Sequence, residues 1–418
     1  MSIQEMMKRI GERARNAAAE LALLKPEIKN KALEAMAASF LVHREQIKAE
    51  NQKDLKAGEK KGLSKAMLDR LLLNDQRIDE MADALRIVAG LDDPVGEIHD
   101  MRVRPNGIKV GRMRCPIGVI GIIYESRPNV TADAGCLCIK SGNAVILRGG
   151  SEAFHSNRII ARLMDEAGAK TGLPEAAIQI IPTTDRRAVD VMLKAQKWID
   201  LIIPRGGTSL IEKVGRNATI PVIKHYAGNC FIYADETADM RQAVSIIVNA
   251  KTQRPGVCNA LETLLLHKDI AKKVLKSLAP RLLEKGVEIR GDETVCRLVP
   301  EAVPAKEKDW DEEYLDLILA VKIVDTLEQA IWFINHHGSH HTDAILTRDY
   351  NHAMSFLTSV DSACVLVNCS TRFSDGGEFG MGCEIGISTD KLHARGPMAL
   401  KELTTSKFVV FGSGQIRA

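Results

Sequence analysis

The stretch Ile117-Gly118-Val119-Ile120-Gly121-Ile122-Ile123-Tyr124 decides the predicted fold, because the pattern of the sequence changes around it. Its nearly continuous apolar run is typical of a strand that is covered on both faces. Residues before about Leu91 show the three-and-four spacing of amphipathic helices. After Tyr124, strand-like and helix-like segments alternate, which predicts βαβ units around a parallel sheet.

The alternation forms two series, separated near Asp235–Asp239, and therefore predicts two α/β domains. An alternating stretch at Met101–Arg114 contains Pro105-Asn106-Gly107, a hairpin signal, and Phe408–Phe411 is strand-like. We predict strands at 117–124, 144–147, 178–181, 199–203, 264–267, 317–324, 343–347 and 363–368, and helices at 152–171, 186–195, 240–250, 270–285, 327–336 and 350–358, with a further helix opening after Gly207.

Composition excludes several classes of protein. A net charge of +3 over 418 residues indicates no dedicated nucleic-acid or membrane surface. No apolar run reaches the length of a membrane span, and the polar N-terminus lacks a secretory core. Nine scattered cysteines do not suggest a disulfide framework, so we expect a cytoplasmic protein.

The segment Lys251–Thr263 carries the candidate nucleophile, Cys258. Pro255 and Gly256 break any helix just before it, which should leave the thiol on a turn. A thiol needs little activation, and the nearby cations Lys251 and Arg254 would favour the thiolate. Taken alone, a buried structural cysteine is the commoner interpretation. The surrounding motifs favour the nucleophile.

Two glycine turns follow predicted strands and open helices. They are Arg148-Gly149-Gly150-Ser151-Glu152 and Arg205-Gly206-Gly207-Thr208-Ser209. Either could be a mere tight turn, but two at one edge of a sheet are what a dinucleotide crevice requires. The candidate cofactor-binding residues here are Arg148, Gly149, Gly150, Glu152, Arg205, Gly206, Gly207 and Ser209.

Three further motifs have competing interpretations. Asn129 follows Pro128 in the segment Tyr124–Asn129 and could donate an amide N–H to an oxyanion, or could simply form a turn. The loop residues around Ser370-Thr371-Arg372 could bind an anionic substrate group, or could have no such role. The histidine cluster Asn335–His341 suggests a metal, but no cysteine or carboxylate cluster accompanies it. We therefore predict no metal site.

Taken together, these residues resemble the aldehyde dehydrogenase superfamily. Cys258 follows a helix and a Gln-containing turn, as the nucleophile of that family does. Glu312-Glu313-Tyr314-Leu315 resembles the segment that carries its nicotinamide-ribose carboxylate, which gives that role to Glu313. Within the superfamily, the likeness is to the branch that reduces L-glutamyl 5-phosphate, and it covers essentially the whole chain. Its most specific pieces are Ile123–Thr131, Ile203–Gly207, Val248–Pro255, His341–Arg348 and Lys391–Met398.

The resemblance implies NADPH-dependent reduction of L-glutamyl 5-phosphate to L-glutamate 5-semialdehyde, with release of phosphate, in proline biosynthesis. Cys258 would form a thioester, and Asn129 would stabilise the oxyanion. NADPH rests on the resemblance alone, since Arg148 would suit a 2′-phosphate and Glu152 would repel it. Candidate substrate contacts are Arg127, Arg254, Ser370, Thr371, Arg372 and His341.

The resemblance also implies an architecture of two Rossmann-like domains with a small β-arm for oligomerisation, giving a homodimer or larger homo-oligomer. Association with glutamate 5-kinase is left open. The implied division is 1–100 for N-terminal helices of the cofactor domain, 101–115 for the hairpin of the arm, 116–238 for the NADP(H)-binding domain, 239–385 for the catalytic domain, and 386–418 for a return segment and the last strand of the arm.

Hydrolytic members of the superfamily carry a glutamate general base where this chain has Lys224-His225-Tyr226-Ala227-Gly228. The missing carboxylate suits an enzyme that passes its acyl group to phosphate rather than to water. Three alternatives remain from the sequence. They are a phosphate-independent aldehyde dehydrogenase acting on a small semialdehyde, a non-catalytic nucleotide-binding regulator, and a metal enzyme built on the histidine cluster.

Overall fold

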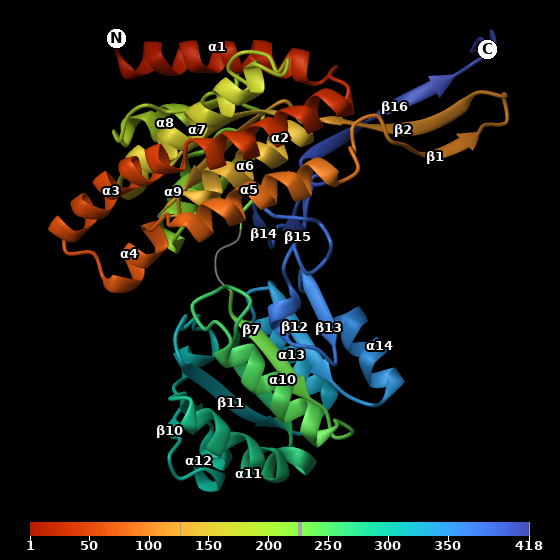
Figure 1. Cartoon of the computed structure of the whole chain (residues 1–418). Helices are drawn as coiled ribbons and strands as arrows, with labels where there is room; N and C mark the ends of the chain where they lie inside the picture. The colour runs from red at the N-terminus through yellow and green to blue at the C-terminus, as the bar shows by residue number, and fades with distance from the viewer. Residues whose placement is uncertain (126, 225–227, 418) are drawn as a thin grey trace. The chain divides into compact units, whose positions relative to one another are not determined.

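The computed structural model describes residues 1–125, 127–224 and 228–417, without the side chains of residues 66 and 208. The chain divides into two compact units, and the ribbon colours of Figure 1, from red to blue, follow the chain through both. The first unit contains residues 1–224, 380–386 and 398–418, and the second contains 225–379 and 387–397. The predicted division at 238 differs from this, because the strand at Cys230–Ala234 pairs inside the second unit.

The first unit is built on a four-stranded parallel sheet of order β5-β4-β3-β6. All six residues of Val119–Tyr124, the central β3, are buried, as the apolar run predicts. The predicted N-terminal helices are confirmed, and α2 and α3 pack against α7. The elements are α1 (Ile3–Leu21), α2 (Pro26–Val42), α3 (Arg44–Lys60), α4 (Lys65–Leu71), α5 (Asp75–Gly90), β3 (Val119–Tyr124), α6 (Asn129–Lys140), β4 (Ala144–Arg148), η1 (Ser151–Ala153), α7 (Phe154–Ala169), β5 (Ile178–Ile180), α8 (Arg187–Met192), β6 (Leu201–Arg205) and α9 (Thr208–Asn217).

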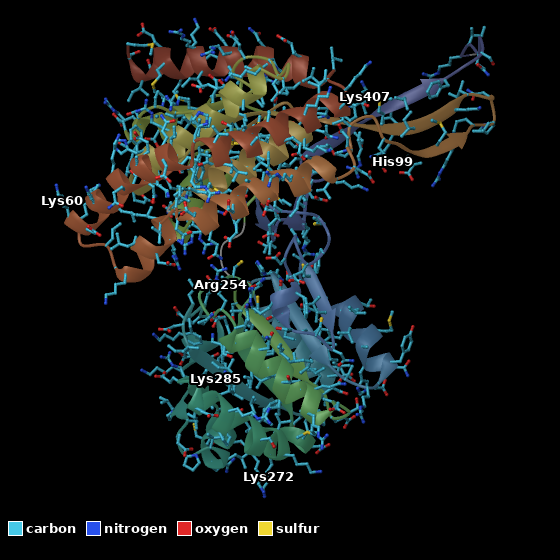
Figure 2. The ribbon with its side chains drawn as sticks, in the orientation of Figure 1. Lys60, His99, Arg254, Lys272, Lys285 and Lys407 are labelled. Carbon is cyan, nitrogen blue, oxygen red and sulfur yellow. The ribbon has the colours of Figure 1, made fainter. Side chains whose placement is uncertain are left out.

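A three-stranded antiparallel sheet extends from the helices of this unit (Figure 1). It consists of β1 (Ile98–Val103), β2 (Lys109–Pro116) and β16 (Thr404–Phe411). The hairpin turn is where the sequence places it, and Gly107 adopts a φ of 88° that favours glycine. Figure 2 shows His99 and Lys407 on this arm.

The second unit is built on a seven-stranded parallel sheet of order β10-β9-β11-β8-β7-β12-β13. Residues of α10, α11 and α12 share one apolar core, whereas residues of α13 and α14 belong to another. The elements are β7 (Cys230–Ala234), α10 (Met240–Thr252), β8 (Leu261–His267), α11 (Lys268–Glu284), β9 (Glu288–Gly291), α12 (Glu293–Leu298), β10 (Val303–Pro304), η2 (Glu307–Trp310), β11 (Ile318–Val324), α13 (Leu327–His337), β12 (Thr342–Leu346), α14 (Tyr350–Ser359), β13 (Cys364–Val367) and η3 (Thr371–Phe373).

A short two-stranded sheet consists of β14 (Gly386–Ser388) and β15 (Gly396–Met398). Among the described residues, none of the helices is long and apolar enough to cross a lipid bilayer.

Candidate active site

The nucleophile segment lies in the second unit, between α10 and β8. Cys258 is half-buried in the turn that the sequence predicts, and its thiol forms no disulfide. The backbone of residue 228 approaches this turn closely, because a Cβ at Gly228 would lie 2.0 Å from the carbonyl oxygen of Cys258. The buried thiol of Cys230 donates to the same carbonyl oxygen at 3.1 Å. No motif in the sequence pointed to this second cysteine.

Lys251 has a different partner from the one expected. Its Nζ lies 2.6 Å from Oε2 of Glu262, and both side chains are completely buried. The expectation that Lys251 favours a thiolate at Cys258 is therefore corrected, because a buried carboxylate already balances its charge. Arg372 is a cation that interacts electrostatically with Cys258.

The loop at Ser370-Thr371-Arg372 packs against the nucleophile segment. The Arg372 guanidinium donates to Oε1 of Gln253 at 2.9 Å and to the side-chain oxygen of Asn259. The amide of Asn259 in turn donates to the carbonyl oxygen of Ser374 at 2.8 Å. These hydrogen bonds connect residues that are 113 to 119 positions apart. They join the Cys258 segment to the loop around Arg372, which are separate motifs in the sequence.

Two other predicted substrate contacts also belong to this region. Arg254 is exposed just after α10 (Figure 2). Burial lowers the pKa of the Arg372 guanidinium, and the positive charge of Arg254 lowers it further. His341 is buried, with Nδ1 at 2.8 Å from Oγ1 of Thr342 and 3.8 Å from the thiol of Cys230. Two arginines, Arg254 and Arg372, and one histidine, His341, therefore lie around the Cys258 turn within the second unit.

Glu313 lies beside the same turn. Its carboxylate accepts a hydrogen bond from the backbone N–H of Gly228, and burial raises the pKa of the carboxyl. The following segment is fixed by Glu262, whose Oε1 accepts from the backbone N–H of Leu315 at 3.2 Å. The second unit thus holds the predicted nucleophile and the predicted ribose-binding carboxylate in neighbouring segments.

In the first unit, Asn129 is the first residue of α6. Its side-chain amide donates to Asp133, one turn further on, at 2.9 Å. Burial raises the pKa of Asp133 to about 6. Since a primary amide carries two N–H donors, this bond uses one of them and holds the group in place. The neighbouring Ser126 lies outside the described residues.

The glycine turns do share one edge of the first unit's sheet. Neighbouring strands pair Ile123 with Arg148 and Tyr124 with Arg205, so the residues that follow β3, β4 and β6 meet there. The carboxyl edge of parallel strands is where ligands bind in such folds. This grouping agrees with the arrangement that the two turns predict.

At β4, however, the chain itself occupies much of the space around the glycines. A Cβ at Gly149 would lie 2.0 Å from Nδ2 of Asn157, and one at Gly150 would lie 2.2 Å from Oε1 of Glu152. The Arg148 guanidinium donates to the carbonyl oxygens of Gly149 and, at 3.1 Å, Thr184. The space beside these glycines is therefore filled by the side chains of Asn157 and Glu152. Arg148 connects the turn after β4 to the loop at Thr184.

The turn after β6 offers a better place for a phosphate. Nothing lies within 4 Å of a Cβ placed on Gly207, and its N–H donates to Oε2 of Glu125 at 3.0 Å. Gly207 caps α9, whose N-terminus attracts anions, so a carboxylate already stands where phosphate would be favoured. Gly206 is closely covered by that same carboxylate, at 2.5 Å from its ideal Cβ, and the side chain of Thr208 lies outside the description.

The histidine cluster has ordinary structural partners. His336 stacks on Trp332, His337 lies 2.8 Å from Asp311, and Nδ1 of His340 lies 2.6 Å from the carbonyl oxygen of Asp361. Each of these three histidines therefore has a partner within the chain.

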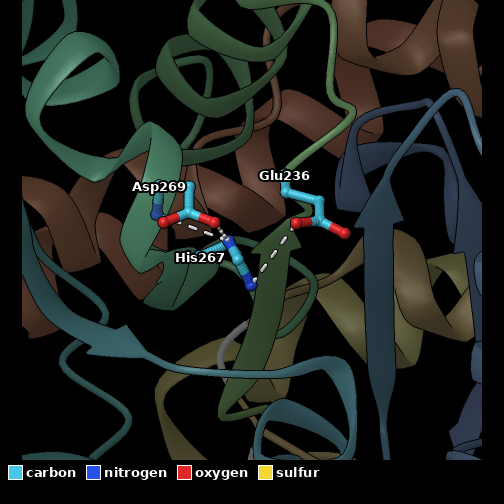
Figure 3. A group of neighbouring side chains, drawn as sticks. All are labelled: Glu236, His267 and Asp269. Carbon is cyan, nitrogen blue, oxygen red and sulfur yellow. Dashed lines mark hydrogen bonds and ion pairs between the residues drawn. The ribbon is translucent and has the colours of Figure 1, made fainter.

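Among described residues, the grouping with metal-ligand spacing is another one, shown in Figure 3: Glu236, His267 and Asp269. Nε2 of His267 lies 3.9 Å from Glu236, and Nδ1 lies 3.7 Å from Asp269. The same Nδ1 accepts the backbone N–H of Asp269 at 3.4 Å, which caps α11. His267 therefore caps α11, and each of its ring nitrogens faces a different carboxylate.

Comparisons with known proteins find relatives of this chain. The model of the aldehyde dehydrogenase family matches residues 2–295. The gamma-glutamyl phosphate reductase of Geobacter metallireducens is 56% identical over the whole length of both chains, and that of Moorella thermoacetica is 57% identical over 97% of each. The crystal structure of gamma-glutamyl phosphate reductase from Thermotoga maritima superposes with a TM-score of 0.96 at 47% identity, covering 99% of this chain and all of that one.

Proposed function

Because this chain belongs to the aldehyde dehydrogenase family and, within it, to the gamma-glutamyl phosphate reductases, we propose that it reduces L-glutamyl 5-phosphate to L-glutamate 5-semialdehyde through a thioester on Cys258. The product belongs to proline biosynthesis. The single observation that carries the mechanism is the half-buried Cys258 turn with Arg372 as its neighbouring cation.

In the proposed mechanism, the Cys258 thiolate attacks the acyl carbon of the substrate. The bond from that carbon to the phosphate oxygen breaks, and phosphate leaves while the thioester remains on the enzyme. Asn129 donates an amide N–H to the oxyanion, and Arg254 and Arg372 neutralise the anionic groups of the substrate. After reduction, the C–S bond breaks, Cys258 leaves as a thiolate and the semialdehyde is released.

Members of the family use a nicotinamide cofactor, and for this chain we propose NADPH, which when bound supplies a hydride to the thioester carbonyl. The N-terminus of α9 attracts anions, and we propose that a phosphate group of the cofactor replaces the Glu125 carboxylate at the N–H of Gly207. Glu313 is proposed to accept hydrogen bonds from the nicotinamide ribose. Arg148, Glu152, Arg205 and Ser209 remain candidates near the adenosine end.

The first test is the reverse reaction, followed as NADP⁺ or NAD⁺ reduction with glutamate 5-semialdehyde and phosphate. We expect kcat/KM to be at least about tenfold higher with NADP⁺, the gain from one charge-assisted hydrogen bond to the 2′-phosphate. Equal values would assign the enzyme to both cofactors. No turnover with either would favour the non-catalytic regulator.

We further propose a homodimer or larger homo-oligomer formed by the arm. Two apolar side chains on alternate positions of the edge strand β16 are largely exposed, Phe408 at 68% and Val410 at 57%. An exposed apolar edge strand favours pairing with another copy. None of the nine cysteines forms a disulfide, which suits the reducing cytoplasm. We also propose that the enzyme associates with glutamate 5-kinase, because that kinase would supply the labile acyl phosphate.

Replacing Phe408 and Val410 by aspartate together should convert the oligomer to a monomer, because like charges would face each other across the paired edge. Light scattering at micromolar concentration measures the mass. Lys407→Asp is the control, since its side chain points to the other face of the strand. An unchanged mass for F408D/V410D would show that the arm does not hold the assembly.

A further inference from the structure

The ion pair between Lys251 and Glu262 brackets the nucleophile. Lys251 lies in the last turn of α10, before Cys258, and Glu262 lies in β8, after it. Their 2.6 Å contact is completely buried, and Lys251 is among the largest fully buried side chains of the described chain. The pair therefore closes the Cys258 turn at its base.

Such a pair is poorly explained by stability alone. Removing two charges from water is costly, and apolar replacements of similar volume are often neutral or stabilising. The cost shows here, because burial raises the pKa of Glu262 to about 7 and lowers that of Lys251. A buried carboxylate that also accepts a hydrogen bond from elsewhere can instead specify one arrangement of the backbone.

Glu262 has such a second contact. Its other oxygen, Oε1, accepts from the N–H of Leu315 at 3.2 Å. Leu315 has a φ of 53°, a conformation that is strained for a residue with a side chain, so the surrounding structure must hold it. The Lys251 ammonium also lies 6.0 Å from the ring centroid of Tyr314. One carboxylate thus joins α10, β8 and the segment 313–315.

That segment carries Glu313, whose carboxylate reaches the N–H of Gly228 against the backbone of Cys258. We propose that Lys251 and Glu262 are positioning residues, which hold Leu315 in its strained conformation and thereby fix Glu313 relative to the nucleophile turn. The inference rests on the proposed function, because it takes Glu313 as the residue that binds the nicotinamide ribose.

A pair of near-isosteric double variants separates positioning from stability. K251M/E262Q removes both charges but keeps a side-chain oxygen for the N–H of Leu315, whereas K251M/E262M removes that oxygen as well. We expect both to fold, and thermal melting checks this. NADPH binding, measured by fluorescence titration, should weaken about tenfold in K251M/E262M and less than about threefold in K251M/E262Q, the difference expected for one hydrogen bond.

Glu262→Asp provides a second measurement in case a double variant does not fold. It keeps the charge opposite Lys251 but shortens the side chain, so it should lose the contact with Leu315 and weaken NADPH binding as K251M/E262M does. Wild-type affinity in a folded E262D or K251M/E262M protein would overturn the proposal. So would an equal loss in K251M/E262M and K251M/E262Q.

A double-mutant cycle with Glu313→Gln identifies the residue through which the pair acts. If the pair acts through Glu313, adding K251M/E262M to E313Q should cause no further loss of NADPH affinity, and a fully additive loss would contradict the inference. Wild-type affinity of E313Q alone would instead remove Glu313 from cofactor binding. That result would reject the proposed function at this residue, and with it the coupling.

Discussion

Cys258→Ala is expected to lower the rate of semialdehyde formation by on the order of 10⁴-fold or more, because no thioester can form without the thiol. NADPH binding should remain close to that of the wild-type protein, since the substitution removes a single half-buried side chain from a turn. Steady-state assays in both directions give the rate, and fluorescence titration gives the affinity for NADPH.

The matched control is Cys296→Ala. Cys296 is also half-buried in the second unit, but it lies on α12, where its thiol donates to the carbonyl oxygen of Gly291. This variant should keep wild-type rates. Appreciable turnover by C258A, in a preparation free of wild-type enzyme, would refute covalent catalysis at this cysteine and leave the family assignment without its proposed mechanism.

Omitting phosphate from the reverse reaction should slow steady-state NADP⁺ reduction by at least about 100-fold, the smaller end of what a general base contributes. The segment from Lys224 to Gly228 has no carboxylate to activate water. The thioester should therefore persist on Cys258 until phosphate attacks it. Rapid mixing should then show a burst of NADPH close to one equivalent per active site, after which almost no further NADPH forms.

Adding phosphate after the burst should restore turnover, and sulfate at equal ionic strength serves as the control, because it cannot form the acyl phosphate product. Steady turnover without phosphate would point to the phosphate-independent aldehyde dehydrogenase that the sequence leaves open. A general base outside the segment 224–228 would then have to be found.

The sequence by itself determined the elements whose signal is local. The apolar run ending at Tyr124 predicted the buried central strand, and Pro255-Gly256 predicted that α10 would end before Cys258. The hairpin followed from Asn106-Gly107, where only glycine accepts the positive φ without strain. These signals need no distant partner, because backbone geometry and face-by-face burial impose them on a few neighbouring residues.

The strand β7 shows where a local pattern fails. Its five residues are all buried, so it has no alternation that would distinguish it from a buried helical segment. The predicted division of the chain at 238 assigned β7 to the first unit, whereas β7 pairs with strands of the second. Its partners, β8 and β12, come from segments roughly 30 and 110 residues further along the chain, and only the folded sheet brings them beside it.

The environment of Cys258 was decided by tertiary structure. Lys251 and Arg372 carry equal charges in the sequence, yet the first is paired with the buried Glu262, whereas the second interacts electrostatically with Cys258. Tertiary structure also decided the partner of Glu125, whose carboxylate accepts the N–H of Gly207 at the N-terminus of α9. Residue types determined which chemistry is available in this protein, but long-range packing determined which charge meets which partner, because electrostatic effects depend on distance and burial that sequence spacing does not contain.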